Sequence, residues 1–118
     1  MEITSGGTPG PRLADEWADL DNNVYGSLRG APAVRELAEA MAAAGWRARS
    51  SSWTQFEVER EWVRLELTER APGDVLVGGV LDPSRLDDLG AALAGLGLRY
   101  SLELWDEEGS ELVRELAG

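Results

Sequence analysis

One stretch decides how the chain folds: it runs from Val75 to Trp105 and reads VLVGGVLDPSRLDDLGAALAGLGLRYSLELW. An earlier stretch, from Asn23 to Trp53, reads NVYGSLRGAPAVRELAEAMAAAGWRARSSSW and aligns with it without a gap at an offset of 52 residues. The two stretches agree at seven of 31 positions. A composition so rich in Ala, Gly and Leu would give roughly two or three identities by chance. The agreement therefore favours a tandem duplication.

Both stretches predict a strand that leads into a helix. The segment 75–81 is apolar on both faces, as expected of a strand deep in a sheet, and the repeat extends this assignment to the weaker segment 24–29. Pro32 marks the first turn of one helix, and Asp82-Pro83 supplies an N-cap and a first-turn proline for the other. The two helices have similar apolar stripes, formed by Val34, Leu37, Ala38 and Met41 and by Leu86, Leu89, Leu93 and Leu96.

A glycine at a matched position is expected to end each helix, Gly45 in the first and Gly97 in the second. In a Schellman ending such a glycine has a left-handed backbone conformation. The residue after the glycine then packs on the residue four positions before the glycine. The resulting pairs are apolar, as the motif prefers: Trp46 with Met41 and Leu98 with Leu93.

The remaining segments alternate between apolar and polar residues, which predicts strands. A hairpin is expected over 54–68, followed by a turn at Ala71-Pro72-Gly73-Asp74, and a further strand over 98–105. Asp106-Glu107-Glu108-Gly109 then predicts a hairpin turn. Residues 110–116 are compatible with a helix or a strand, and we expect a strand because the duplication favours one.

These elements predict a single α+β domain over residues 11–118, preceded by a flexible tail over residues 1–10. Leu13, Trp17 and Leu20 follow Pro11 at helical spacing and predict a short N-terminal helix. Two strand-helix-strand-strand units, about 23–70 and 75–117, can then share one mainly antiparallel sheet with both helices on one face. This is a ferredoxin-like arrangement. An alternative order omits the first strand and matches the element order of small acidic secretion chaperones.

The composition excludes many functions. The chain has no cysteine and no histidine, so the commonest nucleophile, general base and metal ligands are missing. Glu and Asp pairs are abundant, but on an acidic surface most such carboxylates are simply solvated. We therefore expect no enzyme, no catalytic residue, no metal and no cofactor.

The charge balance is strongly acidic: 22 acidic residues face 11 basic ones, for a formal net charge of -11. Such a charge argues against nucleic-acid binding and favours a basic protein partner. Solubility or adaptation to high salt would explain the acidity equally well. The chain has no secretory signal and no run of eighteen apolar residues, so a cytoplasmic protein that does not span a membrane is expected.

Strand alternation predicts where a partner would bind. If the apolar strand residues face the helices, then Trp53, Trp62 and Trp105 lie on the opposite face together with Glu57 and Glu103. Exposed tryptophans rimmed by charge are typical of interfaces. Three alternatives remain for this face: the N-terminal helix covers it, two copies of the chain dimerise through it, or it binds a foreign partner or ligand.

The leading functional hypothesis is therefore an immunity or inhibitor protein that neutralises a basic toxin. A small-molecule-binding or regulatory domain with a ligand cleft on the sheet is the second hypothesis. An enzyme that uses only carboxylates is the third hypothesis. A role like that of a secretion chaperone is a further alternative.

Overall fold

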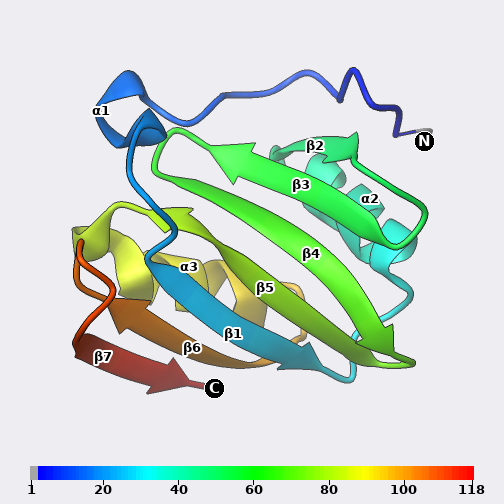
Figure 1. Ribbon diagram of the computed structural model, residues 1–118. Coiled ribbons are helices and arrows are strands. Elements are labelled where there is room, and N and C mark those ends of the chain that lie inside the picture. Colours follow the sequence, from blue (N-terminus) through cyan, green and yellow to red (C-terminus); the bar gives the residue numbers. More distant parts are fainter. Residues whose placement is uncertain (1–2) are drawn as a thin grey trace.

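The computed structural model describes residues 3–118; expectations for Met1 and Glu2 lie outside the described part. The chain forms an α+β fold around one antiparallel sheet of seven strands, in the order β2-β3-β4-β5-β1-β6-β7 (Figure 1). The strands are β1 (Val24–Arg29), β2 (Arg47–Ser50), β3 (Gln55–Arg60), β4 (Val63–Ala71), β5 (Asp74–Leu81), β6 (Arg99–Trp105) and β7 (Leu112–Ala117).

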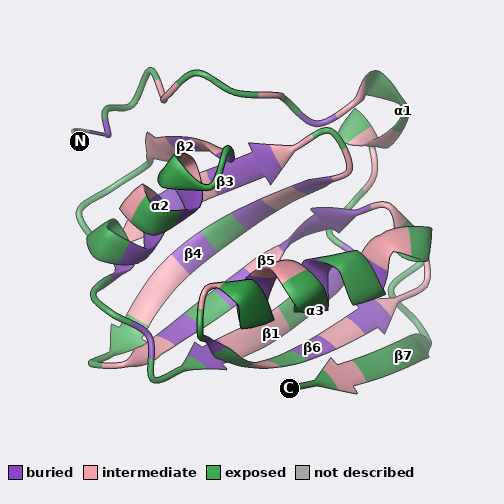
Figure 2. Ribbon diagram, turned by 180° about the vertical axis from the view of Figure 1, so that it is seen from behind, coloured by how far each residue is buried: buried purple, intermediate pink, exposed green. Residues whose placement is uncertain are grey.

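The helices are short, and the two longest cover one face of the sheet. They are α2 (Val34–Ala43) and α3 (Leu86–Gly95), and both lie on the same side of the strands (Figures 1 and 2). We refer to this side as the helix face and to the other as the open face. A single turn, α1 (Asp15–Ala18), and a 3-10 helix, η1 (Pro83–Arg85), complete the elements.

The predicted helix endings are confirmed. Gly45 and Gly97 have φ values of 100° and 77°. Just after them, the Trp46 N–H donates to the Met41 carbonyl at 3.0 Å, and the Leu98 N–H donates to the Leu93 carbonyl at 3.2 Å. These are the hydrogen bonds of a Schellman ending. Each bound of α3 also lies 52 residues after the corresponding bound of α2.

The hydrophobic core lies between the helices and the helix face of the sheet. The apolar stripe of α2 is buried as predicted, and α3 buries Leu86, Leu89 and Leu93. Opposite them, the inward side chains of the central strands are fully buried, among them Leu28, Phe56, Leu65 and Leu102. Burial of this apolar surface is the main force that holds the helices on the sheet.

Strand β1 lies inside the sheet, hydrogen-bonded to β5 on one side and to β6 on the other. The alternative element order that omits this strand, taken from secretion chaperones, is therefore wrong. The strand expected over 110–116 is confirmed as β7. Strand β2 was not predicted, because its four residues, RARS, are too few and too polar to show alternation.

The N-terminal segment lies along the outer edge of β2 (Figure 1). The Thr8 N–H donates to the Ala48 carbonyl at 2.8 Å, and the Ser50 N–H donates to the Thr4 carbonyl at 3.0 Å. Ile3 is buried in the same region. A flexible tail was expected over 1–10. Instead, hydrogen bonds to the otherwise unpaired edge of the sheet hold the described part of this segment in place.

The N-terminal helix is also shorter than the amphipathic pattern predicted. The Ala14 N–H donates to the Glu61 carbonyl and the Leu13 N–H donates to the Glu59 carboxylate, so the backbone remains extended before Asp15. Tertiary hydrogen bonds thus replace the first helical turn. The remaining turn, α1, lies against one end of β5 and leaves most of the open face uncovered (Figure 1).

Candidate interaction surface

The open face carries an unusual row of acidic residues, set by the register of the strands. Glu57 on β3 lies directly opposite Glu66 on β4, and Glu103 on β6 lies directly opposite Glu115 on β7. Like charges directly opposite each other destabilise an antiparallel sheet. From β2 to β7 the complete row reads Arg49, Glu57, Glu66, Gly78, Tyr25, Glu103 and Glu115.

The middle of this row is hollow because Gly78 has no side chain. Around it the structure has a depression of about 360 Å³, lined by the side chains of Glu57, Arg64, Glu66 and Asn22 and by strand β5. The Arg64 side chain has no hydrogen bond or ion pair to another residue of the described chain. A substituent at Gly78 would meet the Tyr25 ring at 3.4 Å, an ordinary contact, so the depression borders that ring.

Two aromatic residues lie beside the acidic row on β1 and β6. Tyr25 is 43% exposed and Trp105 is half-buried. Together with Asn22, Glu103 and Gly109 they line a second depression of about 300 Å³. Amphipathic rings next to carboxylates offer a partner apolar contact area and charge at one place.

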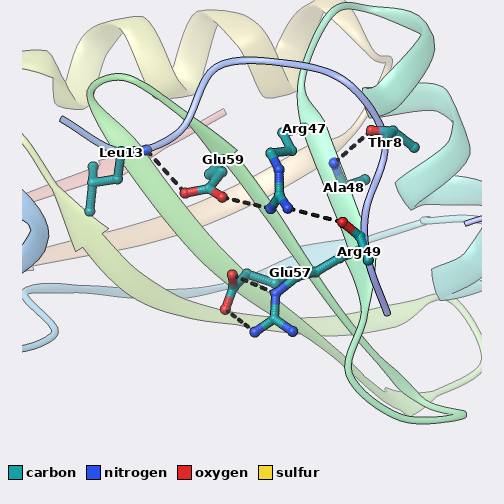
Figure 3. Close-up of polar contacts among 8 residues, drawn as sticks. Thr8, Leu13, Arg47, Ala48, Arg49, Glu57 and Glu59 are labelled. Atoms are coloured by element: carbon teal, nitrogen blue, oxygen red, sulfur yellow. Dashed lines mark hydrogen bonds and ion pairs between the residues drawn. The ribbon is translucent and has the colours of Figure 1, made fainter. Parts of the chain in front are cut away.

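The other end of the row is closed by an ion pair. The Arg49 Nε and Nη2 atoms donate to the two Glu57 carboxylate oxygens at 2.9 and 3.2 Å (Figure 3). This bidentate hydrogen bond, and the charge of Glu57, raise the pKa of Arg49 above its ordinary value. Glu57 is therefore partly neutralised, whereas Glu66, Glu103 and Glu115 form no ion pair within residues 3–118.

A second ion pair attaches the N-terminal segment to the open face. Glu59 is 6% exposed; its carboxylate accepts from the Arg47 Nη1 atom at 2.9 Å and from the Leu13 N–H at 3.0 Å (Figure 3). Arg47 also donates to the Gly6 carbonyl at 3.1 Å. This pair has a structural role, because both charges are used to hold residues 6–13 against the sheet.

The structure does not bring the three predicted tryptophans together. Trp105 lies on the open face as expected. Trp53 is 92% exposed, but it lies in the loop between β2 and β3 and away from the acidic row. Trp62 lies on the opposite side: its ring packs edge-to-face on Trp46 at 6.1 Å, and the Arg85 guanidinium lies 4.7 Å from its centroid.

The error for Trp62 has a clear physical cause. Glu61 and Trp62 form the two-residue turn between β3 and β4, and side-chain alternation does not continue through a turn. The predicted Glu57 and Glu103 are both on the open face. Sequence reasoning missed Tyr25, Glu66 and Glu115 as members of the surface, because their positions become neighbours only through the strand register.

The described residues contain no group of three acidic side chains placed to hold a metal ion. No helix within residues 3–118 is long and apolar enough to cross a membrane. Around the acidic row the open face offers carboxylates, the two rings of Tyr25 and Trp105, and the guanidinium of Arg64.

Comparisons with known proteins give a partial similarity. No family model and no solved structure matches the chain. A segment of 63 residues is 40% identical to glucose-6-phosphate isomerase of Caulobacter vibrioides, in strain NA1000 / CB15N and equally in strain ATCC 19089. It amounts to 52% of this chain, and the chain spans 12% of the length of those enzymes. The similarity is too partial to assign this chain to enzymes or to non-enzymes.

Proposed function

We propose that this chain is a non-enzymatic protein that binds a basic protein partner through its open face. Its most specific form is an immunity or inhibitor protein that neutralises a basic toxin. The observation that carries the proposal is the acidic row, in which Glu103 and Glu115 lie opposite each other without a counter-ion in the described chain. This opposed pair of carboxylates lowers the stability of the free protein. A cationic partner that binds there would supply the missing positive charges and explain why the pair is present.

The charge of the whole chain supports the same proposal. A formal net charge of -11 attracts a basic protein from a distance and speeds the encounter. Tyr25 and Trp105 then provide the apolar contact that slows dissociation, since large aromatic residues are frequent hot spots of interfaces. In this proposal the acidic row aligns the partner and the two rings anchor it.

The test begins with basic proteins encoded next to the gene for this chain. Each is co-expressed with the chain; relief of growth inhibition and a complex measurable by isothermal titration calorimetry are the expected results. Within that complex, Trp105→Ala and Glu103→Arg are each expected to weaken affinity by about 30-fold or more, as at interface hot spots.

The matched control is Glu36→Arg, which reverses an exposed charge on α2, on the far side of the molecule. This variant should keep its affinity within about twofold, because rim and remote charges contribute little. Circular dichroism verifies that all variants are folded. Equal effects of Glu36→Arg and Glu103→Arg would show that only net charge matters and would refute the open face as the interface. A self-associating chain with no basic partner would indicate a homodimer through this face instead.

A second candidate function is a small-molecule-binding or regulatory domain. The depression around Gly78 favours it, since about 360 Å³ lies within the range of ligand pockets. Gly78→Leu would fill this space from a position where a side chain meets only ordinary contacts. A metabolite that stabilises the unaltered chain against heat but not the Gly78→Leu variant would support this function over the first.

We also propose that the fold is an extended ferredoxin-like fold that arose by tandem duplication. The four central strands, in the order β4-β5-β1-β6 with two helices on one face, support the first part. The matched bounds and glycine endings of α2 and α3 support the second. The proposed halves differ in the strand after each helix, because β6 pairs with β1 whereas β2 lies at the far edge. A homologue with more strongly conserved repeats would test the duplication.

A further inference from the structure

At the end of the open face away from α1, two arginines lie directly opposite each other. Arg29 on β1 and Arg99 on β6 are partners in the ladder, and both side chains are exposed. Opposed like charges are unfavourable in a sheet, as in the acidic row. In a chain with twice as many acidic as basic residues, two unneutralised arginines at neighbouring positions need an explanation.

Neither arginine side chain has a hydrogen bond or an ion pair within the described chain. Asp74 is the ladder partner of Arg29 on its other side and would be the natural counter-ion. However, the Oδ2 atom of Asp74 accepts from the Arg70 Nε and Nη2 atoms at 2.9 and 2.6 Å. The Oδ1 atom of Asp74 is buried and has no hydrogen-bond partner, and Arg29 does not reach it. Asp74 is thus paired with Arg70 and not with Arg29, and both guanidinium groups remain available.

Hydroxyl groups occupy the next positions along the same two strands. Ser27 lies directly opposite Ser101, two residues from the arginine pair and on the same face of the sheet. No hydrogen bond of either hydroxyl is found in the described chain. The two serines and the two arginines together line a depression of about 340 Å³, which Tyr100, Ala117 and Gly118 complete.

We propose that this arrangement, which we name the arginine-serine site, binds the phosphoryl group of a small phosphate monoester. Two guanidinium groups supply two positive charges and directional N–H donors, and two hydroxyls supply further donors from the same two strands. This set matches a dianion with three terminal oxygens better than a carboxylate, which has one charge and two oxygens. Polyanions such as nucleic acids are disfavoured, because the rest of the surface is acidic.

The proposal is independent of the basic partner, since the site uses other residues. The serine pair lies next to the Tyr25–Glu103 pair in the strand register, and the arginine pair lies one position further from the acidic row. It also predicts an unusual pattern of stability. Without a bound anion, removal of one arginine relieves repulsion, so Arg99→Gln should be as stable as the unaltered chain or more so. With phosphate the order should reverse, because ligand binding stabilises only the form that binds it.

The experiment measures thermal unfolding and isothermal titration with inorganic phosphate, up to about 20 mM, at constant ionic strength. The melting temperature of the unaltered chain should rise by about 3 °C with saturable binding. Arg29→Gln and Arg99→Gln should each weaken binding at least tenfold, and Ser101→Ala should weaken it less. Arg12→Gln removes an exposed arginine of the N-terminal segment and should change nothing.

Three results would overturn the proposal. Binding of acetate as tight as that of phosphate would refute the assignment to a dianion. Equal loss of binding in Arg12→Gln and Arg99→Gln would show a general charge effect. An unaltered chain that neither binds nor is stabilised by phosphate would show that the arginine pair is not an anion site. Loss of the basic partner in Glu103→Arg, with phosphate binding retained, would separate this site from the proposed interaction surface.

Discussion

Glu103 and Glu115 lie directly opposite each other on β6 and β7, and neither forms an ion pair within residues 3–118. Glu57 and Glu66 have the same relationship on β3 and β4, but there Arg49 binds Glu57 through two hydrogen bonds. One like-charge pair is thus relieved within the chain and the other is not. The difference locates the uncompensated charge at the β6–β7 side of the open face, next to Trp105.

Glu115→Gln is therefore expected to stabilise the protein. Removal of one opposed charge should raise the free energy of unfolding by roughly 0.2–1 kcal/mol, and the gain should shrink at high salt because salt screens exposed charges. Urea denaturation at low and high salt measures it. Glu57→Gln is the matched control. It should lower the free energy of unfolding, since it removes the ion pair with Arg49. Destabilisation by both variants would contradict this account of the row.

Trp62→Ala should reduce stability and leave partner binding intact. The ring packs on Trp46 and under the Arg85 guanidinium, so its removal leaves a cavity at the edge of the core. Because the side chain is only partly buried, the cost should be about 2–3 kcal/mol, below that of a fully buried tryptophan. Trp53→Ala, at a ring that is 92% exposed, should cost less than about 0.5 kcal/mol. If Trp62→Ala lost affinity for the partner and kept full stability, Trp62 would belong to the interaction surface and not to the edge of the core.

The elements that could be predicted are those set by local sequence. Apolar stripes and glycine endings identified α2 and α3, since each signal depends on residues within one or two turns. Alternation identified the longer strands but failed at Trp62, because a turn interrupts it. The candidate surface could be predicted only in part: Trp105, Glu57 and Glu103 were assigned to the right face, but their neighbours depend on strand order and register.

Asn23 shows the same limit. In the sequence it is only the polar residue before the strand expected over 24–29, but in the structure its side chain acts as an extra rung of the ladder. Its amide nitrogen donates to the Leu81 carbonyl and its amide oxygen accepts from the Leu81 N–H, both at 2.8 Å. Nothing in a single sequence separates this role from ordinary turn chemistry, because the partner is 58 residues away.

Asn23→Ala is expected to lower the free energy of unfolding by about 3 kcal/mol. The substitution removes two buried hydrogen bonds and leaves the N–H and carbonyl groups of Leu81 without partners. Chemical denaturation measures the loss. Asn22→Ala, at the exposed neighbouring position, should change stability by less than about 0.5 kcal/mol. Equal effects at the two positions would show that the bonds to Leu81 contribute no net stability.

Glu59→Ala should release the N-terminal segment from the sheet. The substitution removes the acceptor of the Leu13 N–H and leaves the nearly buried Arg47 without its carboxylate, at a cost of about 3 kcal/mol. Hydrogen exchange should then become faster at the Leu13 and Thr8 amides. The amides of β5 should still exchange only through global unfolding of the protein. Glu66→Ala, at an exposed carboxylate of the same face, is the control and should leave exchange at Leu13 unchanged.

The turn between β6 and β7 is expected to weaken in acid. The backbone N–H of Ser110 donates to Asp106 Oδ1 at 2.8 Å and lowers the pKa of Asp106 below its ordinary value of 3.8. A lowered carboxyl pKa means that the ionised form is favoured in the fold. Its stabilising effect is thus fully present above the unfolded pKa and is lost as the pH falls below about 4 and through the folded pKa.

The amide resonance of Ser110 reports this change directly. In NMR spectra recorded from about pH 6 to pH 2, it should shift with the titration of Asp106 and its exchange should accelerate at the acid end. Asp106→Asn keeps an acceptor oxygen but cannot ionise, so the Ser110 resonance should then be flat over the same range. A titration of Ser110 that persists in Asp106→Asn would assign the effect to another carboxylate of this turn, such as Glu107 or Glu108, and would contradict the role given to Asp106.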